Sequence, residues 1–176
     1  MRGENRKDSD ELHGVGKEPV CDPAYWRERL ARCGGELHRA IFNGSITQFD
    51  PFNQEHQRTL RNALQPNDKV LDVGCGYGRL LGLMPSRWQG EYLGVDISDE
   101  MLAVARLMYG SLHPRCQFEW MDLRCSIPND HFDIAIVCSV RPMIIRHQSQ
   151  AMWDMMERYI RAVSDRVLYL TYGEYD

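Results

Sequence analysis

The stretch that decides the fold runs Val70-Leu71-Asp72-Val73-Gly74-Cys75-Gly76-Tyr77-Gly78. Its first half is a short apolar run typical of a buried strand, and its three alternating glycines predict a turn directly after that strand. Glycine there permits a positive φ and lets a ligand approach the backbone closely. The spacing is not G-x-G-x-x-G, so the stretch does not match the dinucleotide fingerprint, and it lacks the lysine of a phosphate-binding loop.

From Lys69 onward, short apolar runs alternate with segments of helical periodicity. We expect strands at 70–73, 92–96, 117–121, 132–139 and 166–172, and helices at 79–84, 98–109 and 149–163. This alternation predicts βαβ units and a parallel sheet covered on both faces. The predicted fold class is therefore α/β: a Rossmann-like, doubly wound, mostly parallel sheet of about five strands in the order 3-2-1-4-5, with ligands at the carboxyl ends of the strands.

The segment before the glycine stretch has a different character. Residues 1–18 are polar and mixed in charge, which predicts a disordered tail. Residues 19–65 show helical spacing in three patches, the first opened by Asp22-Pro23 as N-cap and first helical residue. Residues 66–176 then form the Rossmann-like domain. The length of 176 residues favours one globular unit overall.

Composition narrows the function classes. With 43% hydrophobic and 26% charged residues the chain is globular in type, and its six cysteines show no C-x-x-C spacing, so we predict no metal site. The net charge of −4 gives no general attraction for nucleic acid, although Arg27, Arg29, Arg32 and Arg39 leave a local basic patch possible. Neither a membrane span nor a secretory signal is recognisable, so we expect a cytoplasmic protein.

Two carboxylates follow the next two predicted strands. Asp96 ends the second strand, where a carboxylate can accept both hydroxyls of a ribose. Asp122 ends the third strand, where it can accept a hydrogen bond from the amine of an adenine. A glycine turn and two acids at three successive strand ends predict a binding site for an adenosine group.

These motifs resemble the class I S-adenosylmethionine-dependent methyltransferase superfamily. The matching stretches are VLDVGCGYG, YLGVDIS at 92–98, MDL at 121–123 and FDIAIVCSV at 132–140, and together the resemblance covers about residues 66–172. It implies S-adenosylmethionine as cofactor and S-adenosylhomocysteine as product. The cofactor-binding residues carried over are Asp72, Gly74, Cys75, Gly76 and Gly78 in the loop, Asp96 and Ile97 at the ribose and adenine, Asp122 and Leu123 at the adenine, and Cys138 and Ser139 beneath the sulfonium.

In that superfamily the N-terminal segment commonly forms a lid, which implies a helical lid at 19–65 in this chain. Trp26 could offer its aromatic face to the sulfonium, and Arg29 could pair with the carboxylate of the methionine. Methyl transfer is an in-line displacement in which a general base is optional, so the catalytic residues stay open. The candidates are Ser139, Arg141, His38 and His56.

The chain ends four residues after the last predicted strand, whereas the superfamily usually adds an antiparallel hairpin. We therefore expect a compact version whose fifth strand is an edge, open to a homodimer or a partner chain. The favoured function is methyl transfer to a small molecule or a protein, with nucleic acid a less favoured acceptor. The alternatives are a non-catalytic module that binds S-adenosylmethionine or S-adenosylhomocysteine, or an accessory subunit, and an α/β enzyme such as an NAD-dependent or polyamine-synthase-like one.

Overall fold

A computed structural model describes residues 22–42, 44–111 and 115–172, so the predicted tail at 1–18 lies outside the described residues. The helices are α1 (Pro23–Arg32), α2 (His38–Ile41), α3 (Ile46–Ala63), the 3₁₀ turn η2 (Leu81–Leu83), α4 (Asp99–Tyr109), α5 (Val140–His147) and α6 (Gln150–Ala162). The strands are β1 (Val70–Val73), β2 (Tyr92–Asp96), β3 (Cys116–Trp120), β4 (Phe132–Cys138) and β5 (Ser164–Leu170).

The five strands form one sheet in the order β3-β2-β1-β4-β5, and every neighbouring pair is parallel. This confirms the predicted fold class and strand order. At the centre of the sheet Val73 is in register with Val95 on one side and Val137 on the other. Because all the strands run in the same direction, their carboxyl ends lie together at one edge of the sheet.

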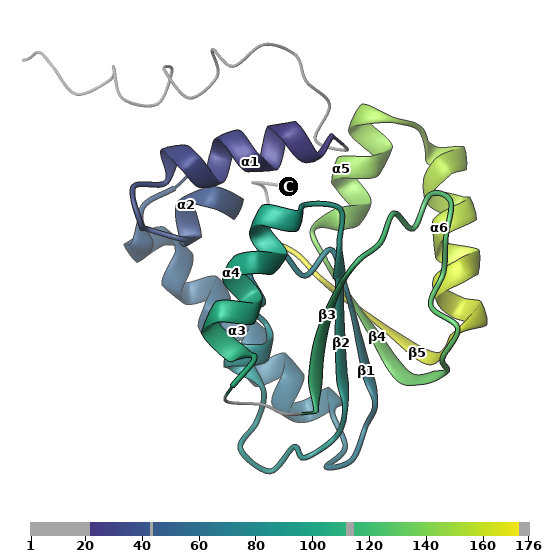
Figure 1. Ribbon diagram of the computed structural model, residues 1–176. Helices are drawn as coiled ribbons and strands as arrows, with labels where there is room; N and C mark the ends of the chain where they lie inside the picture. The colour runs from purple at the N-terminus through teal and green to yellow at the C-terminus, as the bar shows by residue number, and fades with distance from the viewer. Residues whose placement is uncertain (1–21, 43, 112–114, 173–176) are drawn as a thin grey trace, which may run out of the picture.

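Helices cover both faces of the sheet (Figure 1): α3 and α4 on one, α5 and α6 on the other. On the first face Leu60 and Leu64 are fully buried with Val70, so α3 belongs to the core beneath the sheet. On the second face Trp153 and Ile160 of α6 pack against alternate residues of β1 and β4. Burying each such side chain contributes roughly 1.5–3 kcal/mol, and these contacts hold the strand ends in a fixed arrangement.

The first two helices lie across the carboxyl edge of the sheet, next to α4 (Figure 1). Helix α1 begins as predicted, because the Asp22 side chain accepts a hydrogen bond from the Ala24 N–H at 2.8 Å and Pro23 occupies the first helical position. None of the residues of α1 is buried. An exposed ion pair between Arg27 and Glu100, 2.6 Å apart, connects it to α4.

Three elements differ from the expectation. The segment 79–84 holds only the short turn η2, because Pro85 disfavours a helical conformation at Met84, whose ψ is 142°. The four-residue spacing of apolar residues predicts the third N-terminal helix at 51–64, but α3 already begins at Ile46 because Ser45 and Gln48 form a capping box there. Helix α5 was not anticipated; its N-cap residue, Ser139, has a left-handed conformation and makes no side-chain capping hydrogen bond. Across the part of the chain that the structure describes, no helix combines the length and apolar character needed to cross a membrane.

Candidate functional site

A cavity of about 280 Å³ opens at the carboxyl edge of the sheet. Residues at or just after the ends of all five strands line it, together with residues of α1, α2 and α5. Of the predicted cofactor-binding residues the lining includes Trp26, Arg29, Asp72, Gly74, Cys75, Gly76, Asp96, Ile97, Asp122, Leu123, Cys138 and Ser139. Gly78 is not part of the lining; a Cβ there would approach Phe118 and Tyr109 at 3.1 Å, so its role is close packing.

The glycine turn is held open by positive backbone φ angles. Gly74 has φ +68° and Gly76 has φ +54°, a region that other residues rarely adopt. A Cβ on Gly74 would lie 2.5 Å from Val140, whereas a Cβ on Gly76 would meet only Ile41, at 3.9 Å. The turn therefore packs tightly against the start of α5 and presents a bare backbone to the cavity at Gly76.

Asp96 connects the glycine turn to the helix that follows β2. One of its carboxylate oxygens accepts the Gly76 N–H at 2.8 Å and the other accepts the Ser98 N–H at 2.9 Å. Burial raises the pKa of Asp96, while these backbone donors lower it. Each oxygen has further lone pairs, so the carboxylate can still accept hydrogen bonds from two neighbouring hydroxyls in the cavity.

Asp72 is 1% exposed and is only partly satisfied. One oxygen accepts the Tyr92 hydroxyl at 2.6 Å, and the other oxygen is buried without a hydrogen-bond partner among the described residues. Burial raises the pKa of the carboxyl to about 7, although the Tyr92 hydrogen bond and the charge of Arg79 lower it. An unsatisfied carboxylate oxygen at the base of a cavity suits a cationic donor from a ligand.

The raised pKa of Asp72 predicts a pH-dependent stability of the ligand-free protein. Between the ordinary carboxyl value of 3.8 and about 7 the folded state binds more protons than the unfolded state. The free energy of unfolding should therefore decrease as pH rises through this window. Asp72→Asn keeps the neutral form and should make that pH dependence shallower. Urea unfolding of both proteins at roughly pH 4 and roughly pH 8 tests this, and equal changes in the two would contradict it.

Asp122 is already engaged by a neighbour. Arg124 donates to both of its carboxylate oxygens, at 2.8 Å from Nε and 2.7 Å from Nη2, and this pairing lowers the pKa of Asp122. The Asp122 carboxylate lines the cavity as expected, but an amine of a ligand would bind a carboxylate that already accepts hydrogen bonds from Arg124. Its role toward an adenine stays a prediction.

Ser139 follows β4 in an unusual conformation. Its φ of 58° is the one positive φ among the described non-glycine residues, and it places Ser139 at the N-terminus of α5. The hydroxyl is buried without a hydrogen-bond partner in the part of the chain described. Such local strain is tolerated where the surroundings impose it, which is common at functional sites.

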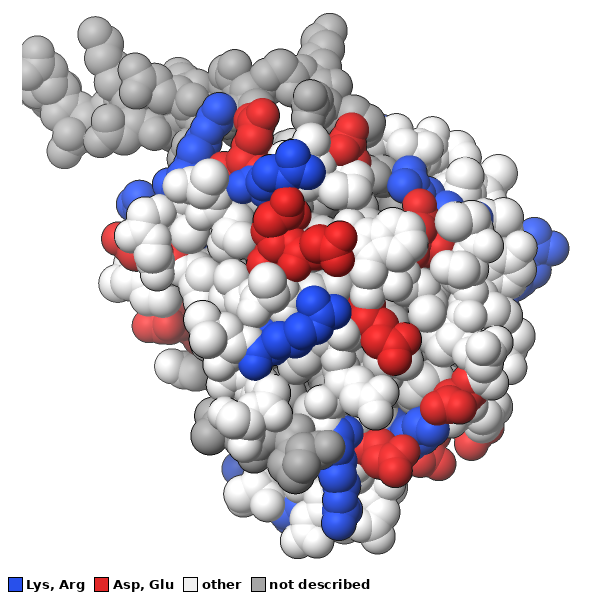
Figure 2. Space-filling view, viewed as in Figure 1, with Lys and Arg blue, Asp and Glu red and all other residues white. Residues whose placement is uncertain are grey.

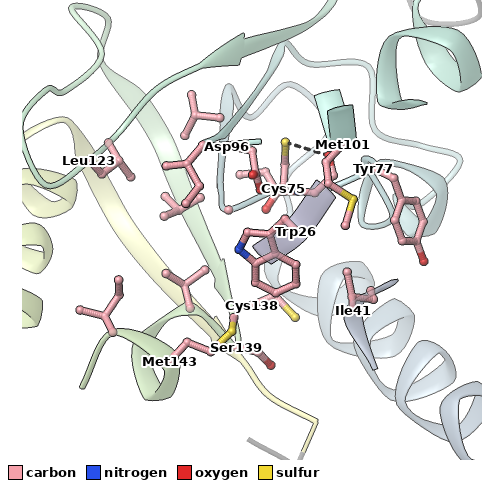
Figure 3. Close-up of a pocket in the computed structure, with 18 of the residues that line it drawn as sticks. Trp26, Ile41, Cys75, Tyr77, Asp96, Met101, Leu123, Cys138, Ser139 and Met143 are labelled. Atoms are coloured by element: carbon pink, nitrogen blue, oxygen red, sulfur yellow. Dashed lines mark hydrogen bonds between the residues drawn. The ribbon is translucent and has the colours of Figure 1, made fainter. Parts of the chain in front are cut away.

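Helices α1, α2 and α5 complete the wall of the cavity (Figure 3). Trp26, Ile41 and Met143 lie around the same space as Asp96 and Ser139. The Arg29 guanidinium donates to the Tyr25 hydroxyl and to the Arg39 carbonyl, each at 3.0 Å. Helices α1 and α2 thus bring aromatic and cationic groups to the cavity, whereas α3 of the same N-terminal segment belongs to the core; a lid function for residues 19–65 stays a prediction.

Three of the four catalytic candidates lie outside the lining: His38, His56 and Arg141. His56 is buried under the site, where its Nε2 donates to the Thr171 carbonyl at 2.9 Å and its Nδ1 accepts from Arg79 at 3.0 Å. This pairing occupies both ring nitrogens, so His56 is poorly placed to act as a base. Ser139 is the only one of the four candidates in the lining.

Arg79 and Tyr172 also line the cavity, although the sequence assigned them no role there. Arg79 directly follows the glycine turn, and that adjacency was the available signal. Tyr172 comes just after β5, so only its position at a strand end could have indicated it.

Comparisons with known proteins agree with this geometry. Residues 70–163 match a family model described as a methyltransferase domain. The chain is 35% identical over 108 residues to a trans-aconitate 2-methyltransferase of Azoarcus, covering 57% of this chain and 40% of that protein. It is 37% identical over 75 residues to one of Escherichia coli O157:H7, covering 42% of this chain and 28% of that protein. The chain therefore spans less than half the length of these curated relatives.

Solved structures show the same fold. One is a magnesium protoporphyrin IX methyltransferase from Synechocystis with bound S-adenosylhomocysteine, with TM-score 0.58 and 18% identity, covering 83% of this chain and 64% of that one. Another is an S-adenosylmethionine-dependent methyltransferase from Clostridium acetobutylicum, with TM-score 0.57 and 20% identity, covering 81% of this chain and 56% of that one.

Proposed function

Because the chain belongs to the methyltransferase domain family, we propose that it transfers a methyl group from S-adenosylmethionine to a small-molecule acceptor by in-line displacement. The observation that carries this proposal is the cavity at the strand ends. It combines a bare glycine turn, the Asp96 carboxylate with unused lone pairs, and a buried Asp72 oxygen without a partner.

The residues present fit the cofactor. Asp96 would accept the two ribose hydroxyls, and the backbone at Gly76 would lie along the ligand. The orphaned oxygen of Asp72 would accept a hydrogen bond from the ammonium group, which offsets the cost of leaving that oxygen unsatisfied. Ile97 and Leu123 would flank the adenine beside Asp122, and Arg29 would pair with the carboxylate. When bound, the cofactor supplies a methyl group on a sulfonium, which is a strong electrophile.

The protein's own contribution would be alignment and exclusion of water. Cys138 and Ser139, which line the cavity at the end of β4, would lie beneath the reacting methyl, and Trp26 of α1 would cover the cofactor. Holding two reactants in line can supply several kcal/mol of the barrier reduction. A base among these residues is needed only if the acceptor is protonated at neutral pH.

Two considerations favour a small-molecule acceptor. The curated relatives with the matching segment are named for trans-aconitate, a small molecule. On the face shown in Figure 2, acidic and basic side chains lie side by side and the basic ones do not form a continuous surface. A cytoplasmic location and pairing of a second copy along the edge of β5 stay predictions.

Calorimetric titration tests the proposal first. We expect S-adenosylmethionine and S-adenosylhomocysteine to bind with micromolar affinity, and NAD to bind far more weakly or not at all. Incubation with methyl-labelled cofactor and small acids, phenols and amines should then transfer label to a member of the set. Preference for NAD would overturn the cofactor assignment, and cofactor binding without transfer to any acceptor would favour a binding module.

A further inference from the structure

Arg79 is a buried arginine whose side chain reaches the cavity. It is 8% exposed and belongs to the cavity lining. Its Nη1 donates to the Asn53 amide oxygen at 2.7 Å, and its Nη2 donates to His56 Nδ1 at 3.0 Å and to the Cys138 sulfur at 3.3 Å. The guanidinium also lies near the Phe49 and Tyr172 rings, 5.5 Å and 5.3 Å from their centroids.

All of these partners are neutral or weakly acidic groups. Among the described residues no carboxylate forms an ion pair with the guanidinium, although the charge of Asp72 acts on it at longer range. Burial raises the pKa of the Cys138 thiol, so this partner carries no charge. A buried cation without an ion-pair partner is costly unless a bound anion completes it. Arginine has five N–H donors, and the named contacts use three, which leaves donors for a further acceptor.

The charged side chains around the cavity also favour a negatively charged ligand. The charged side chains of its wall are Arg29, Arg79, Arg124, Arg146, Asp72, Asp96 and Asp122. Asp122 is paired with Arg124, so these two charges offset each other. The remaining lining has more positive than negative charge, although the chain as a whole carries −4. This local excess is complementary to an anionic acceptor.

We propose, on the basis of the methyltransferase function above, that the acceptor is a small carboxylic acid and that Arg79 binds one of its carboxylates. Arg79 lies against Cys138, next to Ser139, so it reaches the side of the cavity where the acceptor would meet the methyl group. The contacts from Asn53 and His56 on α3 fix the plane of the guanidinium. The N–H of Nε and one N–H of Nη1 stay available, so a carboxylate oxygen could accept a charged hydrogen bond from a guanidinium whose plane is already fixed.

The chemistry is consistent with the groups available. A carboxylate oxygen forms a bond to the methyl carbon as the carbon–sulfur bond breaks, and the electron pair of that bond stays on sulfur. The products are a methyl ester and S-adenosylhomocysteine, and no proton moves. Carboxylic acids are ionised at neutral pH, so the absence of His38 and His56 from the cavity lining is no obstacle.

The test measures acceptor binding and cofactor binding separately. Wild-type protein and Arg79→Gln are titrated with S-adenosylhomocysteine, and the loaded proteins are titrated with trans-aconitate, citrate, fumarate and benzoate. We expect at least one acid to bind the wild type, and Arg79→Gln to weaken that binding about 10- to 150-fold, as loss of a charged hydrogen bond predicts. The cofactor Kd should stay unchanged, and Arg79→Lys should retain part of the affinity.

Arg87→Gln is the matched control. Arg87 also holds α3, through hydrogen bonds to the carbonyls of Arg61 and Leu64, but it lies outside the cavity lining. The Arg87→Gln variant should leave the affinities for S-adenosylhomocysteine and for the acid unchanged. If Arg79→Gln does not fold, the wild type alone decides: the ionised acid should bind and its neutral methyl ester should not.

The outcomes separate the two proposals. Failure of the wild type to bind the cofactor overturns the proposed function itself. Cofactor binding with no acid bound, equal binding of acid and ester, or an unchanged acid affinity in Arg79→Gln overturns the role of Arg79 alone. A weakened cofactor Kd in Arg79→Gln would assign the guanidinium to the carboxylate of the methionine instead.

Discussion

Gly76→Val is expected to abolish cofactor binding while the protein stays folded. Gly76 has φ +54°, and a Cβ there would extend toward Ile41 at 3.9 Å, across the wall of the cavity. A valine would fill the space in which the ligand meets the bare backbone, and its branched side chain would strain the turn by about 1–3 kcal/mol. Displacement of the turn would also weaken the hydrogen bond from the Gly76 N–H to Asp96.

Gly34→Val is the control that separates the effect of backbone strain from the effect of filling the cavity. Gly34 has a similar φ of +59°, but nothing lies within 4 Å of a Cβ built there, and it does not line the cavity. Calorimetric titration with S-adenosylhomocysteine and urea unfolding should show that both variants lose stability, whereas only Gly76→Val loses binding. Near-normal affinity in Gly76→Val would mean that the glycine turn is not the cofactor site.

Asp96→Ala has the second large effect. The variant removes the acceptor for the ribose hydroxyls and also the carboxylate that holds the Gly76 and Ser98 N–H groups at 2.8 and 2.9 Å. Loss of charged hydrogen bonds of this kind costs about 1.5–3 kcal/mol, so the cofactor Kd should rise about 10- to 150-fold. The same titration measures it.

Asp99→Ala provides the comparison for Asp96→Ala. Asp99 is an exposed acid in the first turn of α4, three residues farther along the chain, and it does not line the cavity. Its removal should leave the Kd unchanged. An unchanged Kd in Asp96→Ala would show that Asp96 serves only the architecture of the turn.

The sheet was predictable because its signals are local. Short apolar runs such as 70–73 and 92–96 are bounded by glycine or acidic residues, and their alternation with helical periods admits few topologies. The boundaries of β3, β4 and β5 differ from the prediction by one or two residues. Helix α5 was missed because its N-cap residue, Ser139, is in a left-handed conformation and makes no side-chain capping hydrogen bond, and neither property can be read from the sequence.

The site was predictable where function depends on strand ends. Asp96 and Asp122 follow from sheet topology, since parallel strands bring their carboxyl ends together, whereas Asp72 was assigned only through the family resemblance. The neighbours that modify these residues were not foreseeable. Arg124 on Asp122 and Tyr92 on Asp72 are matters of side-chain geometry, and Arg79 depends on α3, which lies far from it in the sequence.

Ser139 has a consequence for how the protein would change under selection. Its left-handed backbone and its buried, unpartnered hydroxyl each cost about 1–3 kcal/mol, and one residue bears both. Ser139→Gly would relieve both costs without disturbing the strand before it. Selection for thermal resistance alone would therefore favour glycine at this position, and retention of serine would be the mark of a requirement other than folding.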